Sequence, residues 1–197
     1  MEELKIDSDD EKYVGWYFQE LKEAGIVKDF KRAESYTLNK SLIIRYQEIK
    51  QLVTKVKVIE KSQTLIPNKV YTPDYEVLWL KGENTKKLVQ VLKPEIPITK
   101  AFICQLLKGN FTSIVEVKPI HDMNNMTRLF KTNQAVMWEV HDIYVNLVTY
   151  QELFEATFTP LKYIIEEGSY KKNSKHGNKG DNKIKWKVRT LQEYLEC

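Results

Sequence analysis

The feature that most restricts the fold is a short apolar stretch, residues 113–117 (Ser-Ile-Val-Glu-Val), which carries a charge where a buried strand should have none. Side chains alternate between the two faces of a strand, so Glu116 and Lys118 lie on one face together with Ile114. The valines at positions 115 and 117 lie on the other face. Burying a carboxylate and an ammonium group on one face is costly unless something pairs them. The stretch therefore predicts a core strand whose charges are compensated.

A second stretch, residues 71–79, poses the same problem earlier in the chain. It predicts a strand that begins at Pro73-Asp74 and continues with alternating apolar side chains. A divalent metal bridging Asp74 and Glu116, with Lys118 facing a bound phosphate, accounts for all three charges. The alternative is a chance salt bridge between Glu116 and Lys118 on an edge strand, since Glu-x-Lys alone is a common tripeptide.

Pro73, Asp74, Glu116 and Lys118 together resemble the core motif of the PD-(D/E)xK nuclease superfamily, which is Pro-Asp, a variable gap, Asp or Glu, any residue, and Lys. The resemblance implies an α/β fold with a central mixed β-sheet flanked by helices, the restriction-endonuclease-like core. It also implies hydrolysis of DNA phosphodiester bonds with Mg²⁺ or Mn²⁺, ions that hard oxygen ligands suit. In size and opening helix, the chain looks like the small phage-type and resolvase-like members.

The resemblance also implies roles for individual residues. It makes Asp74 and Glu116 metal ligands, with the backbone carbonyl of Val117 as a third. Lys118 would position the attacking water or stabilise the pentavalent phosphate. In small phage nucleases a glutamate of the opening helix joins the metal site, and Glu11 is the matching position. The alternative for Glu11 is a helix-start glutamate whose charge complements the helix dipole.

Gln134 is a further candidate, four residues before Trp138 on a helix expected after the Glu-x-Lys strand. In some exonuclease branches of the superfamily, a glutamine and a tyrosine at this spacing contact DNA. This chain has tryptophan instead of tyrosine. The favoured alternative is that Trp138 packs in the core and Gln134 faces solvent.

The net charge of +4 is distributed unevenly. Residues 169–189 hold seven lysines and one arginine against one aspartate, so this segment carries +7 and the remainder −3. A basic segment on a mildly acidic body predicts a surface for nucleic-acid phosphates. The candidate DNA contacts in it are Lys171, Lys172, Lys175, Lys179, Lys183 and Lys185. The alternative is a solvated, lysine-rich loop without a ligand.

Length and composition set further bounds. A chain of 197 residues with 42% hydrophobic and 29% charged residues predicts one soluble domain, with its core over residues 7–160 and a mobile loop at 169–183. No apolar run approaches the roughly 20 residues of a membrane span. Cys104 and Cys197 are too few for a disulfide framework, which suits a reducing cytoplasm, that of the host cell if the protein is phage-encoded. No glycine loop for a nucleotide cofactor is present.

Hydrophobic spacing and turn residues predict the order of elements. Helices are expected at residues 9–24 (with Ser8 as cap and Gly25 as stop), 125–140, 151–158 and 190–195. Strands are expected near residues 35–38, 42–49, 52–60, 70–80, 113–117 and 143–149. Residues 82–110 are interpreted as an insertion between the two strands that carry the charged side chains.

Taken together, these patterns predict a metal-dependent nuclease that acts on DNA in phage or mobile-element replication, recombination or processing, with a homodimer left open. The alternative is a non-catalytic nucleic-acid-binding protein on the same fold. A third interpretation is an accessory protein that binds through the basic segment alone. A degenerate superfamily member usually loses one of Asp74, Glu116 and Lys118, and this chain keeps all three, which favours the enzyme.

Overall fold

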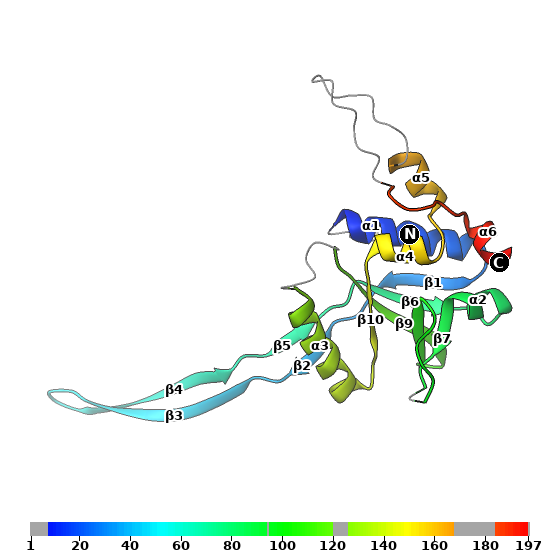
Figure 1. The fold of residues 1–197 in the computed structure, drawn as a ribbon. Helices are drawn as coiled ribbons and strands as arrows, with labels where there is room; N and C mark the ends of the chain where they lie inside the picture. The colour runs from blue at the N-terminus through cyan, green and yellow to red at the C-terminus, as the bar shows by residue number, and fades with distance from the viewer. Residues whose placement is uncertain (1–7, 94, 120–125, 168–183, 197) are drawn as a thin grey trace, which may run out of the picture. The chain divides into compact units, whose positions relative to one another are not determined.

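A computed structural model describes residues 8–93, 95–119, 126–167 and 184–196, and the chain forms two compact units (Figure 1). The larger unit consists of Met1–Glu34 and Pro73–Cys197, and the smaller unit is Ser35–Thr72. The chain therefore leaves the larger unit just after one strand and returns to it at the Pro73-Asp74 pair.

The larger unit is an α/β fold built on a mixed sheet. Its strands are β1 (Val27–Arg32), β6 (Tyr75–Trp79), β7 (Val89–Val91), β8 (Phe102–Leu107), β9 (Asn110–Val117) and β10 (Val145–Val148). They lie in the order β1-β6-β9-β8-β7, and β10 also pairs with β9. The β1–β6, β6–β9 and β8–β9 pairs are antiparallel, whereas β7–β8 and β9–β10 are parallel. The expected central mixed sheet flanked by helices is confirmed.

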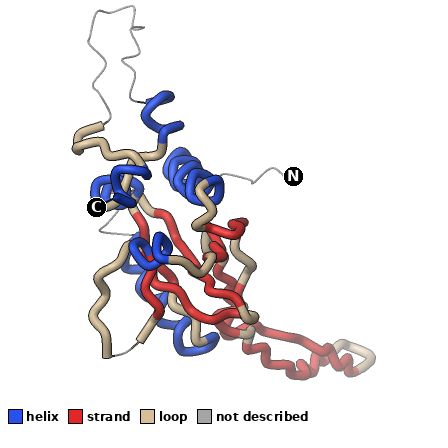
Figure 2. The backbone as a smooth tube through the Cα atoms, turned by 90° about the vertical axis from the view of Figure 1, so that its right-hand side faces the viewer, coloured by secondary structure: helices blue, strands red, loops and turns tan. Residues whose placement is uncertain are grey.

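The helices of the larger unit pack around this sheet, as Figure 2 shows. They are α1 (Asp9–Glu23), α2 (Glu83–Leu88), α3 (Met126–His141), α4 (Tyr150–Ala156), α5 (Leu161–Glu167) and α6 (Leu191–Glu196). The expected ends of α1 are confirmed. Ser8 Oγ accepts a hydrogen bond from the Glu11 amide (3.2 Å), and Gly25 takes a positive φ of 70° after the last turn.

One face of the sheet carries the main hydrophobic core. Alternate residues of β6, the side chains of Tyr75, Val77 and Trp79, are buried there with apolar residues of α1, α4 and α5. Aromatic rings make up much of this layer. Tyr17 of α1, for example, stacks on Phe158 with ring centroids 4.3 Å apart. Burial of this many large side chains anchors α1 against the sheet.

The opposite face is covered by α3. Ile103, Ile114 and Val145 alternate with the strand residues of the main core and are buried outside that cluster. Phe130 and Met137 of α3 are buried as well. This second face matters for function because Glu116 shares it with Ile114.

Both edges of β9 are occupied. β6 pairs with one edge, and the other is divided between β8, which pairs with residues 110–112, and β10, which pairs with residues 114–117. The buried side chain of Asn146, on β10, links β8 and β9 at the point where β8 and β10 share this edge. Its NH₂ group donates to the carbonyl oxygens of Ile103 and Ile114 (both 2.9 Å), and its oxygen accepts from the Ile103 amide (2.8 Å). β9 is thus an internal strand.

Helix α1 is joined to β6 by a close approach at Gly15. A Cβ added to Gly15 would lie 3.0 Å from the hydroxyl oxygen of Tyr75, which donates to the carbonyl oxygen of Glu11 (2.7 Å). The Tyr75 ring cannot move away easily, since it is 3% exposed and packs 5.5 Å from the Phe18 ring, between centroids.

We therefore expect Gly15→Ala to lower the melting temperature, although alanine inside a helix normally stabilises by about 1 kcal/mol relative to glycine. Thermal unfolding of the single variant, of Tyr75→Phe and of the double variant measures the effect. In the Tyr75→Phe background, Gly15→Ala should be stabilising. Stabilisation of equal size in both backgrounds would show that the contact with the hydroxyl is harmless.

The smaller unit is an extended hairpin. It consists of β2 (Tyr36–Asn39), β3 (Leu42–Gln51), β4 (Val56–Ile66) and β5 (Lys69–Tyr71). β2 pairs with β5 and β3 pairs with β4, both antiparallel. The expected pairing of an arm near residues 42–49 with a strand near 52–60 is confirmed, but residues 52–55 form the turn rather than strand.

Several predicted elements differ from the structure. The single strand expected at residues 70–80 is two strands, β5 and β6, which belong to different units. Residues 82–110, interpreted as an insertion, supply α2 and two strands of the central sheet, β7 and β8. β1 and α5 were not predicted.

Candidate functional site

Asp74 lies immediately before β6, where main-chain hydrogen bonds hold it. Its amide donates to the carbonyl oxygen of Val115 (3.0 Å), and its own carbonyl accepts from the amide of Ala33 (3.4 Å). The carboxylate oxygen Oδ2 accepts a hydrogen bond from the amide of Val117 (2.7 Å). The Asp74 carboxylate is therefore positioned by the backbone of β9.

Glu116 and Lys118 lie at the carboxyl end of β9, beside Asp74. The β6–β9 register pairs Tyr75 with Val115, and continuing it by one residue places Asp74 opposite Glu116. Residues opposite each other in an antiparallel pair point to the same face of the sheet. The two stretches singled out in the sequence thus meet, and their carboxylates share one face.

Glu116 and Lys118 form an ion pair with Oε1 and Nζ 2.6 Å apart. The pair is largely buried, since the Glu116 side chain is 8% exposed and that of Lys118 is 20% exposed. The salt bridge that was the alternative to a metal site is therefore present, but the edge-strand location expected for it is wrong because β9 is paired on both edges. An ion pair on an internal strand carries a desolvation cost that a purely structural sheet would avoid with apolar residues.

The pKa of Asp74 records how these charges interact. The pKa is raised from 3.8 to about 7, chiefly by burial and then by the negative charges of Glu116 and, to a smaller extent, Glu11. The hydrogen bond from the Val117 amide and the positive charge of Lys118 act in the opposite direction. Asp74 therefore lies in a locally negative environment, which a bound cation would relieve.

The backbone carbonyl of Val117 faces the same edge of β9 as Asp74. The N–H and C=O groups of one strand residue point to the same side of the strand, and the Val117 N–H points to the Asp74 carboxylate. The next residue confirms the alternation, because the Lys118 amide donates to Val148 of β10 on the opposite edge (2.9 Å). Asp74, Glu116 and the Val117 carbonyl thus present oxygen atoms around one corner of the sheet.

Glu11 lies at the start of α1, next to this corner. Its side chain is 13% exposed, and its Oε2 is 3.6 Å from Nη1 of Arg32 at the end of β1. Its Oε1 also accepts a hydrogen bond from Ser8 (3.1 Å). The effect of Glu11 on the pKa of Asp74 is smaller than that of Glu116. Glu11 therefore occupies an outer position, paired with a cation.

The oxygen-rich corner fits one kind of metal better than another. Among the described residues, no group of three or more His, Cys, Asp or Glu side chains lies close enough to hold a metal. A zinc-type site of three or four protein side chains therefore does not fit. Mg²⁺ is usually held by one or two carboxylates, keeping several waters and adding substrate phosphates. Asp74, Glu116 and the Val117 carbonyl fit that pattern.

The other predicted contact residues do not join this group. Gln134 is half-buried, and its amide donates to the carbonyl oxygen of Val145 (2.5 Å), so it secures α3 to β10. The interpretation of Trp138 as a core residue is wrong, because 46% of it is exposed, and Gln134 does not simply face solvent. Lys171, Lys172, Lys175, Lys179 and Lys183 lie outside the described residues.

The described end of the basic segment packs against the main core. Lys185 is exposed, but its neighbour Trp186 packs on Tyr163 with ring centroids 6.1 Å apart and donates from its indole to Thr159 (2.9 Å). Residues 184–187 belong to the basic segment and follow the mobile loop that was expected at residues 169–183. The half-buried tryptophan fixes this part of the segment against the main core.

Two residues near the corner were missed by the sequence analysis. Arg32 pairs with Glu11, and Tyr75 ties the first turn of α1 to β6 directly beside Asp74. Nothing local distinguished Arg32, since the residues around it form a charged strand with a single buried residue, Val27. The position of Arg32 beside Glu11 depends on the pairing of β1 with β6, which the local sequence does not reveal.

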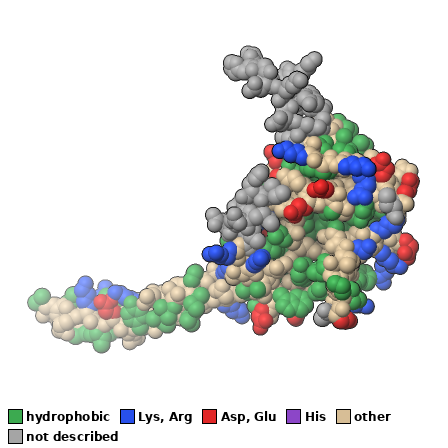
Figure 3. All heavy atoms as spheres, viewed as in Figure 1, with side chains coloured by type: hydrophobic (Ala, Val, Ile, Leu, Met, Phe, Trp, Pro, Cys, Tyr) green, Lys and Arg blue, Asp and Glu red, His purple; other side chains and the backbone are tan. Residues whose placement is uncertain are grey.

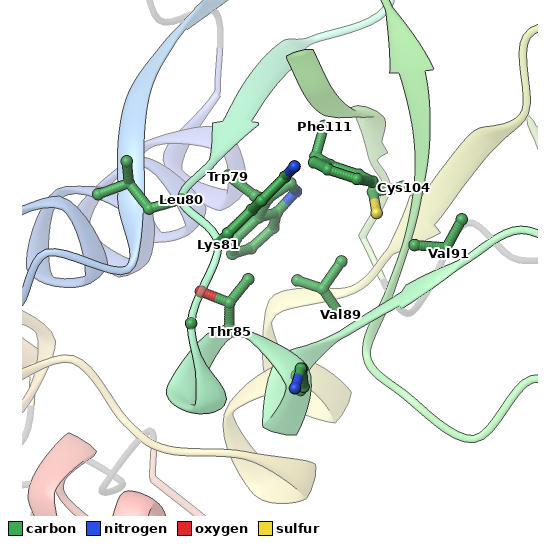
Figure 4. Close-up of a pocket in the computed structure, with 10 residues that line it drawn as sticks. Trp79, Leu80, Lys81, Thr85, Val89, Val91, Cys104 and Phe111 are labelled. Carbon is green, nitrogen blue, oxygen red and sulfur yellow. The ribbon is translucent and has the colours of Figure 1, made fainter.

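A separate hollow lies at the far end of β6 (Figure 4). It has a volume of about 270 Å³, and its lining includes Trp79, Val89, Cys104 and Phe111. Lys81 also lines it, with its Nζ 5.0 Å from the centroid of the Phe111 ring in a cation–π contact. Asp74 and Trp79 stand at opposite ends of the strand. The hollow offers no carboxylate or histidine and is therefore distinct from the corner.

Comparison of this chain with protein-family models, with curated proteins and with solved structures finds no match. Among the described residues, no helix has the length and apolar character needed to cross a membrane. The functional argument therefore depends on the geometry and electrostatics of the corner formed by Asp74, Glu116 and Lys118.

Proposed function

We propose that this protein is a metal-dependent nuclease of the PD-(D/E)xK type that hydrolyses DNA phosphodiester bonds. The observation that carries the proposal is the hydrogen bond from the Val117 amide to the Asp74 carboxylate, which brings the aspartate to the residue between Glu116 and Lys118. Two strands of the mixed sheet thereby present a carboxylate pair and an ammonium group on a rigid backbone.

Each residue has a distinct task in this proposal. Asp74, Glu116 and the Val117 carbonyl would hold Mg²⁺ or Mn²⁺, which supplies charge neutralisation at the phosphate and a more acidic bound water. Lys118, at the rim of the site, donates hydrogen bonds to the attacking water or to a phosphate oxygen. Arg32 balances the charge of Glu11 and so limits the negative potential that incoming DNA meets.

A cleavage assay tests the proposal. The protein is incubated with linear, circular and four-way-junction DNA in Mg²⁺, in Mn²⁺ or in chelator. We expect cleavage that requires the metal and that Glu116→Gln lowers by more than about 100-fold. Glu83→Gln is the matched control, because that carboxylate is 85% exposed on α2 and should be dispensable. Equal activity of the two variants, or cleavage in chelator, would refute the assignment.

The second candidate is a non-catalytic nucleic-acid-binding protein on the same fold. Two observations favour it: the described residues contain no group of three metal-ligating side chains, and Glu11 and Glu116 are already paired with cations. The same assay separates the candidates. DNA binding without cleavage under any metal condition supports the binding protein.

A further inference from the structure

The hairpin of β3 and β4 carries an excess of positive charge. Residues 35–72 hold six lysines and one arginine against two glutamates, which gives this unit a net charge of +5. The excess of positive charge extends to the tip of the hairpin. The hairpin tip, residues 49–59, contains Lys50, Lys55 and Lys57 and no acidic residue.

The two lysines of the strands at the tip are placed directly opposite each other. The β3–β4 register pairs Lys50 with Lys57, so both side chains point to the same face, and both are exposed. Like charges directly opposite in an antiparallel pair destabilise the pair. The described structure places no carboxylate in an ion pair with either lysine. This arrangement becomes favourable when an anion lies against the face.

Nothing in the smaller unit covers the hairpin. β3 and β4 pair only with each other, and no residue of either strand is buried. Figure 3 shows apolar and Lys or Arg side chains side by side along this surface. A two-stranded ribbon alone is marginally stable in water, so a ribbon of 10 and 11 residues is expected to gain from a partner.

We propose that the hairpin tip binds the phosphate backbone of duplex DNA through Lys50, Lys55 and Lys57. The choice of DNA rests on the proposed function, whereas the anionic character of the partner rests on the charges of the tip. A two-stranded ribbon is narrow enough to follow a groove of the duplex between its phosphates. The contacts are made to phosphates, so the binding carries little sequence preference.

The face opposite the lysines defines the competing explanation. Ile49 pairs with Val58 there, and they are 71% and 54% exposed. An exposed apolar pair at the end of a ribbon could instead pack against a second copy of the chain. The two explanations place the partner on opposite faces of the same ribbon, so variants of each face distinguish them.

The test measures binding of a labelled duplex by fluorescence anisotropy at several salt concentrations, in chelator so that no cleavage occurs. The test variant is Lys50→Gln/Lys55→Gln/Lys57→Gln. The matched control, Lys28→Gln/Lys93→Gln/Lys100→Gln, removes the same charge from exposed lysines of the larger unit. The hairpin variant should fold normally, because it removes a like-charge pair.

We expect the hairpin variant to lose about tenfold or more in affinity at physiological salt and to flatten the log–log salt slope by about 2–3, which is 0.9 per phosphate contact. The control should change much less. Equal losses in the two variants overturn the proposal. So does a hairpin variant that binds as the wild type while Ile49→Thr/Val58→Thr converts a dimer to a monomer in light scattering.

The outcome for the hairpin is separable from the outcome for the nuclease. At saturating DNA in Mg²⁺, the hairpin variant should cleave at the wild-type rate, since no proposed metal ligand lies in residues 35–72. If the protein binds DNA through the hairpin but cleaves none, the result supports DNA binding by the hairpin tip and refutes only the proposed nuclease activity.

Discussion

Asp74→Asn should abolish metal-dependent cleavage and, at pH 8 without metal, should make the protein more stable. Asparagine has nearly the same shape, and its side-chain oxygen can still accept the hydrogen bond from the Val117 amide. What it removes is a charge that burial and the neighbouring carboxylate of Glu116 make unfavourable. We expect cleavage to fall by more than about 100-fold.

The stability gain should depend on pH in a defined way. The pKa of Asp74 is raised from 3.8 to about 7 in the folded protein, so the folded state binds this proton more tightly than the unfolded chain. Its contribution to stability is therefore fully present below pH 4, is lost as pH rises to about 7, and stays lost above that. The full change is equivalent to roughly 4 kcal/mol.

Urea unfolding of the wild type and of Asp74→Asn at pH 5 and pH 8 measures this difference. Asp29→Asn is the control, because the pKa of Asp29 is shifted in the opposite direction. Lys22 and the Phe30 amide lower the pKa of that exposed carboxyl group. This control should be neutral or slightly destabilising. Addition of Mg²⁺ at pH 8 should stabilise the wild type but not Asp74→Asn. A variant that loses stability at pH 8 would contradict the assigned electrostatics.

The local elements of this fold could be predicted from the sequence, whereas the pairings could not. Ser8, the apolar spacing of α1 and Gly25 define a helix through contacts within a few residues, and the structure has it at Asp9–Glu23. The alternation in residues 113–117 likewise defines β9. The expected strand at 70–80 failed because the chain passes between two units at Pro73, which local apolar spacing does not reveal.

The candidate site shows the same division. Asp74, Glu116 and Lys118 could be chosen because charge on an apolar strand is conspicuous. The partner of Glu11 could not, because Arg32 reaches it only after β1 pairs with β6. Trp138 was expected in the core, but it is exposed because the buried stripe of α3 runs through Phe130 and Met137.

Lys118→Met should give the largest loss of stability of any change at the site. It leaves the Glu116 carboxylate, 8% exposed, without the ammonium group 2.6 Å away, and removing one partner of a buried ion pair costs about 3 kcal/mol. Lys31→Met is the matched control. Its ammonium group, 3.4 Å from Glu76, sits on a side chain that is 54% exposed, so its loss should cost less than about 1 kcal/mol.

Urea unfolding at pH 8 compares these variants with the double variant Glu116→Gln/Lys118→Met, which should recover most of the loss because no charge remains to be paired. Mg²⁺ should also restore part of the stability of Lys118→Met, since a cation held by Asp74 and Glu116 replaces the missing positive charge. Cleavage should not return, because the metal does not replace the hydrogen bonds that Lys118 donates to water or phosphate. Equal costs for Lys118→Met and Lys31→Met would mean that the ion pair contributes nothing to the fold. Restoration of cleavage by Mg²⁺ alone would remove Lys118 from the proposed chemistry.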